Sequence, residues 1–294
     1  MHDAGSLPWL EEPLARLERL LASQRVPHGL LLQGPAGWGT ASFAAEVTRR
    51  LLALPPDRAI QDLAHPDLRR VEPDGAVIKV DAIRELAAFA VGTRQQAPAK
   101  VALLESAHAM NGQAANALLK TLEEPAPQTY LVLESEYPGR LLPTIRSRVQ
   151  SFAIRPQPAV AERWLRDRLE GNEQALELAF EYGGAPLAAL QAADAQLEPL
   201  RGALEAGLIE RRSERVFDAL QAAPQEDVLL RLLRYLVATT SGQGLRALAS
   251  TEPRTLVGFQ QEVLALHHAM QSSNSVNVPL QFERLAHRFV SLRA

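Results

Sequence analysis

Residues 34–41 read Gly-Pro-Ala-Gly-Trp-Gly-Thr-Ala, and their glycines have the spacing of a phosphate-binding loop. Such a loop follows the pattern G-x-x-x-x-G-K-[ST], in which the lysine contacts the β- and γ-phosphates and the hydroxyl residue holds Mg²⁺. Gly34 and Gly39 occupy the two glycine positions, and Gly37 lies between them. Thr40 stands at the lysine position and Ala41 at the hydroxyl position. The loop therefore keeps only backbone N–H groups and a helix N-terminus as anion ligands.

Two further observations bear on this loop. No lysine precedes Lys79, so a small shift of register does not restore the motif. A strand-to-helix turn that merely favours glycine is an alternative interpretation of the same residues.

A site that hydrolyses nucleotides also needs an acidic residue at the end of a neighbouring strand, followed by a carboxylate that polarises the attacking water. The apolar residues 101–104 lead into Glu105, and Ser106 follows. Glu105 is long enough to reach a metal ion, whereas Ser106 is a poor substitute for a base. A solvated residue at a strand end is the alternative for Glu105. Both sequence motifs of hydrolysis are thus degenerate, and we expect no intrinsic catalysis.

The elements that must position these residues alternate along the first half of the chain. Short apolar segments predict strands, and segments with helical spacing predict helices between them. This alternation predicts a parallel, doubly wound α/β sheet. The expected strands are 27–33, 101–104, 130–133 and 151–154, and the expected helices are 14–21, 40–54 and 111–122.

Beyond this region the sequence predicts helices only. The proline-spaced residues 155–158 mark a linker, because proline fixes φ and disfavours helix in the residue before it. We expect three domains: an α/β domain over 1–155, a helical lid over 156–200 and a helical collar over 201–294. The expected helices are 159–170, 172–182, 187–193, 211–222, 227–239, 255–270 and 280–292.

Composition narrows the classes of protein. The 294 residues are 47% hydrophobic and contain no cysteine, which excludes disulfides, thiolate metal sites and a cysteine nucleophile. The seven histidines form no H-E-x-x-H pair, and the neighbours His267 and His268 point in different directions on a helix. We therefore expect no metal site at these two histidines. No secretion signal or membrane-length apolar run is found, and we expect a cytoplasmic protein without a membrane partner. The net charge of −3 neither favours nor excludes a nucleic-acid partner, so any contact with nucleic acid must be made by a local surface patch.

Two longer motifs carry a resemblance to a known family. Residues 116–125 read Asn-Ala-Leu-Leu-Lys-Thr-Leu-Glu-Glu-Pro, and residues 141–148 read Leu-Leu-Pro-Thr-Ile-Arg-Ser-Arg. Both resemble subunits of the AAA+ clamp-loader family, as do residues 65–67 (His-Pro-Asp) and 80–84. The match covers residues 8 to about 152 well. It implies an AAA+ P-loop-like domain followed by lid and collar domains.

The resemblance also implies a role for one arginine. Residues 147–149 (Ser-Arg-Val) fall on the family's Ser-Arg-Cys motif, whose arginine reaches across a subunit interface to the nucleotide of its neighbour. Guanidinium suits this role because it is planar, always charged and offers paired donors to phosphate oxygens. We therefore expect Arg148, with Ser147 beside it, to act in trans. A surface arginine that caps a helix end is the alternative, and we adopt that alternative for Arg146.

Three departures separate this chain from hydrolysing members of the family. The four-cysteine zinc module that relatives carry before the His-Pro-Asp segment is missing, so we expect no zinc. Leu187 and Ala188 stand where hydrolysing members place a nucleotide-sensing arginine. The third departure is the phosphate loop itself, which lacks the lysine and the hydroxyl residue that bind phosphate and Mg²⁺. We therefore do not expect ATP as a cofactor.

These residues predict a non-hydrolysing subunit of a clamp loader. The resemblance implies a delta subunit and tau/gamma subunits as partners, and the sliding clamp and primed DNA through the complex. A divergent AAA+ ATPase that uses backbone amides and Glu105 is the alternative. A nucleic-acid module acting alone is a third hypothesis, but aromatic residues are only 5% of the chain.

Overall fold

The protein is described here from a computed structural model, and the chain packs as two compact units, residues 1–164 and 165–294. The structure describes residues 6–55, 60, 63–75, 77–169, 173–182, 184–194, 200–222, 225–240, 244–272 and 276–293. The expected boundary near residue 200 adjoins residues 195–199, which lie outside this set, as do residues 56–59, 61 and 62 of the shortened segment 51–64. The division into lid and collar domains stays a prediction.

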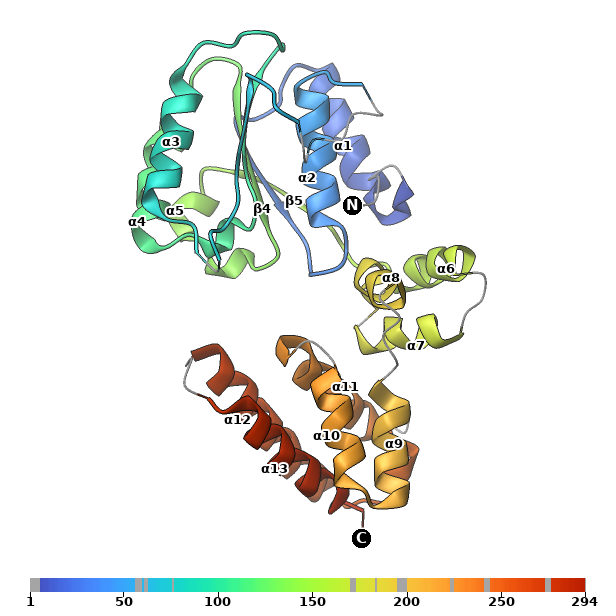
Figure 1. Cartoon of the computed structure of the whole chain (residues 1–294). Helices are drawn as coiled ribbons and strands as arrows, with labels where there is room; N and C mark the ends of the chain where they lie inside the picture. The colour runs from blue at the N-terminus through green and yellow to red at the C-terminus, as the bar shows by residue number, and fades with distance from the viewer. Residues whose placement is uncertain are drawn as a thin grey trace. The chain divides into compact units, whose positions relative to one another are not determined.

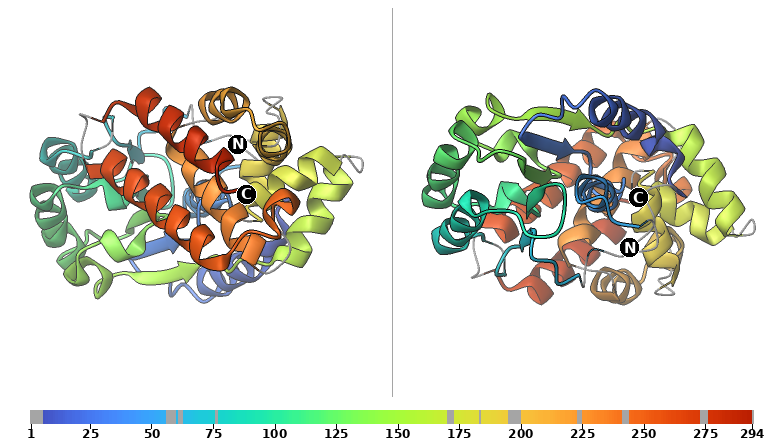
Figure 2. Two further views of the ribbon diagram at one scale, coloured as in Figure 1. Left: turned by 90° about the horizontal axis from the view of Figure 1, so that it is seen from below. Right: turned by 90° about the horizontal axis from the view of Figure 1, so that it is seen from above.

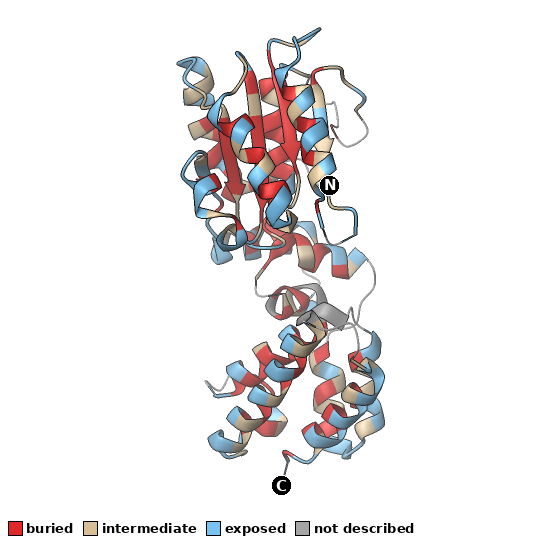
Figure 3. Cartoon of the chain, turned by 90° about the vertical axis from the view of Figure 1, so that its left-hand side faces the viewer, coloured by how far each residue is buried: buried red, intermediate tan, exposed pale blue. Residues whose placement is uncertain are grey.

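The N-terminal unit contains a five-stranded sheet of order β2-β3-β4-β1-β5, in which every pairing is parallel. The central strands are buried along almost their whole length (Figure 3), as expected for a parallel sheet covered on both faces. The doubly wound α/β fold predicted from the sequence is confirmed. The strands are β1 (Gly29–Gln33), β2 (Leu68–Val71), β3 (Lys100–Leu104), β4 (Thr129–Ser135) and β5 (Gln150–Ala153).

Helices cover both faces of this sheet (Figure 1): α1 and α2 lie on one side, and α3, α4 and α5 lie on the other. One core cluster joins side chains of β1, β3 and β4 to the inner faces of α3 and α4. The helix α4 begins after Asn111, whose side chain accepts a hydrogen bond from Ala114 N–H at 2.8 Å. The bounds are α1 (Glu11–Ala22), α2 (Thr40–Leu51), α3 (Val80–Val91), α4 (Gly112–Glu123), α5 (Pro143–Arg146) and α6 (Pro158–Arg168).

The sequence missed one strand and three helices. The strand β2 escaped because Arg69 and Arg70 interrupt its apolar pattern. Both arginines are paired in the folded unit, Arg69 with Glu85 and Arg70 with Glu105. The helices α3, α5 and α9 (Leu200–Glu210) were also not predicted. The charges that hide β2 are therefore accommodated by acids that are distant in the sequence.

In its described residues, the C-terminal unit contains helices joined by turns and loops, and no strand. Its core is rich in leucine and phenylalanine, and α12 and α13 run side by side (Figure 2). The predicted all-helical character of this region is confirmed. Besides α9, its helices are α7 (Glu173–Glu181), α8 (Pro186–Asp194), α10 (Ser213–Ala222), α11 (Gln225–Thr240), α12 (Pro253–Ser272) and α13 (Val278–Val290).

A buried polar cluster joins α7 to α9 and α11 within this unit. Glu181 is fully buried, and its carboxylate accepts hydrogen bonds from Tyr235 Oη at 2.9 Å, from Arg201 N–H at 3.2 Å and from the guanidinium of Arg231. A buried carboxylate is stable only when such partners compensate for lost hydration. The cluster therefore ties residues of the expected lid to residues of the expected collar.

Candidate functional site

The glycine loop connects β1 to α2 through two glycines with left-handed backbone conformation. It leaves β1 at Gln33, and Gly37 and Gly39 adopt left-handed φ angles of 74° and 86° before α2 begins at Thr40. Such φ angles are accessible to glycine at no steric cost. At Gly34, an added Cβ would approach Ile154 Cβ to 2.9 Å and Thr40 Oγ1 to 3.0 Å. The loop is therefore a tight strand-to-helix turn whose glycines are required.

None of the side chains of the loop is positively charged. Thr40, at the lysine position, is only 2% exposed, and its hydroxyl is buried without a hydrogen-bond partner. Trp38 is also buried, and its carbonyl accepts a hydrogen bond from Trp9 Nε1 at 2.8 Å. The two indole rings pack edge to face with their centroids 5.6 Å apart. The loop is fixed by apolar packing, and it offers an anion backbone N–H groups but no charged side chain.

The strand-end acid Glu105 is paired rather than free. Arg70 of β2 donates to Glu105 Oε1 from Nε at 2.8 Å and from a terminal nitrogen at 2.7 Å. Both side chains are about one quarter exposed. The two residues line a cavity of about 50 Å³ together with Ala41 and Ala44 of α2. Ligand pockets usually measure roughly 300–1,000 Å³. Arg70 was missed because its strand was missed.

A second acid, Glu134, is buried near the same strand ends. It is 5% exposed at the end of β4, and its carboxylate accepts a hydrogen bond from Ser106 N–H at 2.7 Å. Burial is the main reason that its pKa is raised to about 7; the Ser106 bond opposes the shift, and the charges of Glu136 and Glu105 add to it. The sequence shows an acid at a strand end here, but only the pairing of the strands shows that it is enclosed.

Arg148 follows α5 and lies at the surface of the N-terminal unit. Its Nε and one terminal nitrogen donate to Glu123 Oε1 at 2.9 and 2.6 Å, and the other terminal nitrogen donates to the Thr144 carbonyl at 2.9 Å. The same nitrogen lies 3.3 Å from Ser147 Oγ, which in turn donates to Thr144 O. The Arg148 side chain stays 35% exposed. Ser147 and Arg148, predicted to act together, therefore share one hydrogen-bonded group.

Arg148 and the glycine loop lie at opposite ends of the neighbouring strands β1 and β5. Arg148 precedes β5, whose Gln150 pairs with Leu30 near the start of β1. The Arg148 carbonyl lies beside Gly29, where an added Cβ would approach it to 3.1 Å. The loop starts at Gly34, one full strand further on, which is about 16 Å at the usual rise of a strand. The structure thus groups the loop with Glu105 and separates Arg148 from both.

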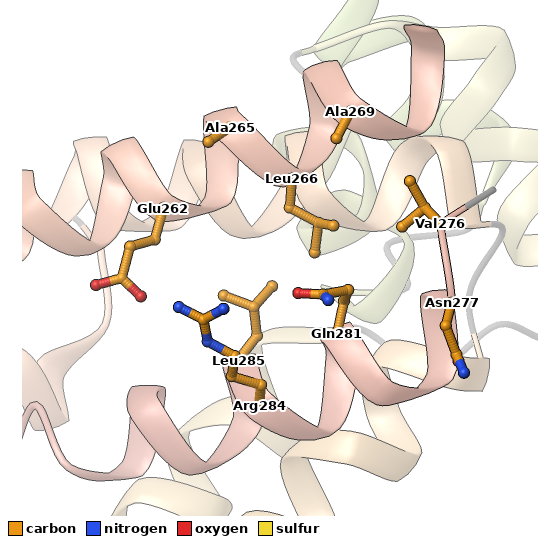
Figure 4. A pocket seen from close by; sticks show the side chains of 9 residues that line it. All are labelled: Glu262, Ala265, Leu266, Ala269, Val276, Asn277, Gln281, Arg284 and Leu285. Carbon is orange, nitrogen blue, oxygen red and sulfur yellow. The ribbon is translucent and has the colours of Figure 1, made fainter. Parts of the chain in front are cut away.

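The C-terminal unit holds a larger cavity of about 440 Å³ between α12 and α13. Figure 4 shows apolar side chains such as Leu266 and Leu285 in its wall and the polar Glu262, Gln281 and Arg284 around it. No residue predicted as a site from the sequence lines this cavity.

The residues that the structure describes form neither a metal cluster nor a membrane span. Within those ranges, no three acidic or histidine side chains converge so as to hold a metal ion. Across the same part of the chain, no helix is both long and apolar enough to cross a bilayer.

The strand order, with a glycine loop after the interior strand β1 and helices beyond the sheet, defines an AAA+-like unit followed by helical domains. A solved structure of a DNA polymerase III, gamma subunit-related protein from Thermotoga maritima has this fold. It matches with a TM-score of 0.55 over 95% of this chain and 99% of that chain, at 18% identity. The predicted fold class is therefore confirmed.

The family model described as DNA polymerase III, delta subunit, matches residues 9–158, just over half of the chain. The chain belongs to this family. Similar relatives named DNA polymerase III subunit delta′ come from Pseudomonas aeruginosa (42% identity over 202 residues, 63% of this chain and 61% of the relative) and Escherichia coli (32% over 198 residues, 62% and 59%). The matched region covers about three fifths of the length of these relatives.

Proposed function

We propose that this chain is the delta′ subunit of a DNA polymerase III clamp loader and that it supports ATP-driven loading of the sliding clamp onto primed DNA. Its own loop does not hydrolyse ATP. Instead, Arg148 completes the ATP site of a neighbouring tau/gamma subunit. The names of the delta′ relatives and the family match support the polymerase assignment.

The position of Arg148 is the observation that carries the trans role. The backbone of Arg148 lies at the end of the strands away from its own loop, about one strand length from Gly34. An arginine side chain is too short to cover that distance, so Arg148 cannot serve its own loop. It is nevertheless partly exposed, and it stands on the Ser-Arg pair of the family motif. An exposed arginine there is suited to the nucleotide of an adjacent subunit.

Three features support the absence of hydrolysis. Thr40 and Ala41 replace the residues that bind phosphate and Mg²⁺. The carboxylate of Glu105 is engaged by the guanidinium of Arg70. The cavity that Arg70 and Glu105 line with Ala41 measures about 50 Å³, well below the roughly 300–1,000 Å³ of usual ligand pockets. We infer that neither ATP nor zinc is a cofactor of this chain.

The remaining proposals concern assembly. The helices of residues 201–294 form a collar that holds this subunit in the ring with the delta and tau/gamma subunits. Leu230 and Val237 of α11 are large apolar residues that are 43% and 58% exposed, which supports a protein-facing surface.

The trans role is tested with Arg148→Ala in a complex reconstituted with delta and tau/gamma subunits. Arg146→Ala is the matched control, because it removes a second arginine only two residues away. At saturating clamp and primed DNA, we expect Arg148→Ala to lower the ATPase kcat by about tenfold or more with assembly intact. Unchanged kcat, or an equal fall for both variants, would refute the role. Mg²⁺-dependent ATP turnover by the purified chain would instead support the divergent-ATPase alternative.

A further inference from the structure

The guanidinium of Arg148 is held by acceptors from two separate elements. Thr144 O and Ser147 Oγ belong to its own segment, whereas Glu123 is the last residue of α4 and lies 25 positions away in the chain. Glu123 is the partner that engages both Nε and a terminal nitrogen, and it does so through one oxygen, Oε1. The direction in which Arg148 points therefore depends on α4 as well as on α5.

The place of Glu123 is poor for helix stability. It ends α4, where the negative end of the helix dipole disfavours a carboxylate. The ion pair is also substantially exposed, at 35% for Arg148 and 49% for Glu123, and such pairs contribute little to stability. The arrangement is thus better explained by the orientation it gives to Arg148 than by the stability it gives to the fold.

The bonds still leave Arg148 able to donate. A guanidinium has five N–H groups. In the structure one goes to Glu123 from Nε, one to Glu123 from a terminal nitrogen, and two point to Thr144 O and Ser147 Oγ. With respect to the described part of the chain, one N–H remains on the terminal nitrogen bound to Glu123. This N–H could thus donate to a phosphate oxygen while the bonds of Arg148 to Glu123, Thr144 and Ser147 stay in place.

We propose that Glu123 is a positioning residue that orients Arg148 for its action in trans, an inference that rests on the proposed function. A flexible arginine loses rotamer freedom when it meets a phosphate, and an arginine already held by three acceptors loses less. Because the pair is exposed, the effect is modest: we expect removal of the Glu123 carboxylate to lower kcat about 3- to 10-fold.

The experiment compares four new variants with the wild type and with Arg148→Ala in the reconstituted complex, after assembly has been verified. Glu123→Ala removes the acceptor, and Glu123→Gln keeps an amide oxygen at the same place. Glu124→Ala removes the adjacent carboxylate as a matched control. Glu123→Ala combined with Arg148→Ala tests whether the two residues act together.

We expect Glu123→Ala to lower kcat 3- to 10-fold with little change in the KM for ATP. Glu123→Gln should retain at least about half of the wild-type kcat, and Glu124→Ala should match the wild type. The double variant should equal Arg148→Ala alone, because Glu123 acts only through Arg148.

Three outcomes would overturn the inference. A kcat for Glu123→Ala equal to the wild-type value would show that the carboxylate does not position Arg148. A kcat above the wild-type value would show that the Glu123 carboxylate keeps Arg148 away from the neighbouring nucleotide. A further fall in the double variant would show a separate role for Glu123. If Arg148→Ala itself leaves kcat unchanged, the proposed function fails; if only Glu123→Ala does so, the inference alone fails.

Discussion

Glu134→Gln tests the electrostatics of the strand ends beside the glycine loop. The pKa of Glu134 is raised from 4.5 to about 7, mainly by burial, so the folded state favours the protonated acid. The stability associated with this proton is fully present below about pH 4.5 and is lost as the pH rises through about 7. A shift of this size corresponds to about 3 kcal/mol.

Glutamine resembles the protonated acid and can still accept the hydrogen bond from Ser106 N–H. We therefore expect Glu134→Gln to be nearly neutral at pH 4.5. At pH 8.5 it should stabilise the N-terminal unit by up to about 3 kcal/mol. Glu12→Gln, at an exposed position on α1, is the control for a general loss of charge.

The assay uses the distribution of tryptophan in the chain. All three tryptophans, Trp9, Trp38 and Trp164, lie within residues 1–164, so their fluorescence in urea reports unfolding of that unit alone. A variant that is destabilised at pH 8.5, or whose effect is the same at both pH values, would refute this account of Glu134.

Two further predictions use the same assay. Asp67 is fully buried, and although burial alone would raise its pKa, hydrogen bonds from the backbone N–H groups of residues 95–97 lower it. Asp67→Asn should therefore lower the free energy of unfolding by about 2–3 kcal/mol at pH 7. The variant should also lose less stability than the wild type as the pH falls below about 4, and an unchanged sensitivity to acid would contradict this. Gly34→Ala should destabilise the unit by about 1–3 kcal/mol, because its Cβ would lie 2.9 Å from Ile154 Cβ, whereas Gly139→Ala, with open space around it, should have a much smaller effect.

The sequence predicted those parts of the fold that depend on local pattern. The apolar runs of β1, β3, β4 and β5 and the glycine spacing before α2 are local signals, and the structure confirms each of these elements. The strand β2 was missed because Arg69 and Arg70 break its pattern, and their acidic partners are 16 and 35 residues away. Pairing over such distances leaves no local signal.

The candidate site, like the fold, could be predicted from the sequence only in part. The replacement of lysine by Thr40 and of the hydroxyl residue by Ala41 is visible in the sequence. The partners of the site residues are not: Arg70 reaches Glu105 only because β2 pairs with β3, and Glu123 reaches Arg148 only because α4 ends beside α5. Sequence motifs therefore identified the groups, and the tertiary structure supplied their neighbours.

The most direct test of the central claim is the kcat of clamp- and DNA-stimulated ATP hydrolysis by the reconstituted complex, with wild-type chain and with Arg148→Ala. Our account predicts a fall of about tenfold or more for Arg148→Ala, with the subunits still assembled and Arg146→Ala at the wild-type rate. Equal rates for Arg148→Ala and the wild type would contradict it, and would leave Arg148 as an ordinary surface arginine.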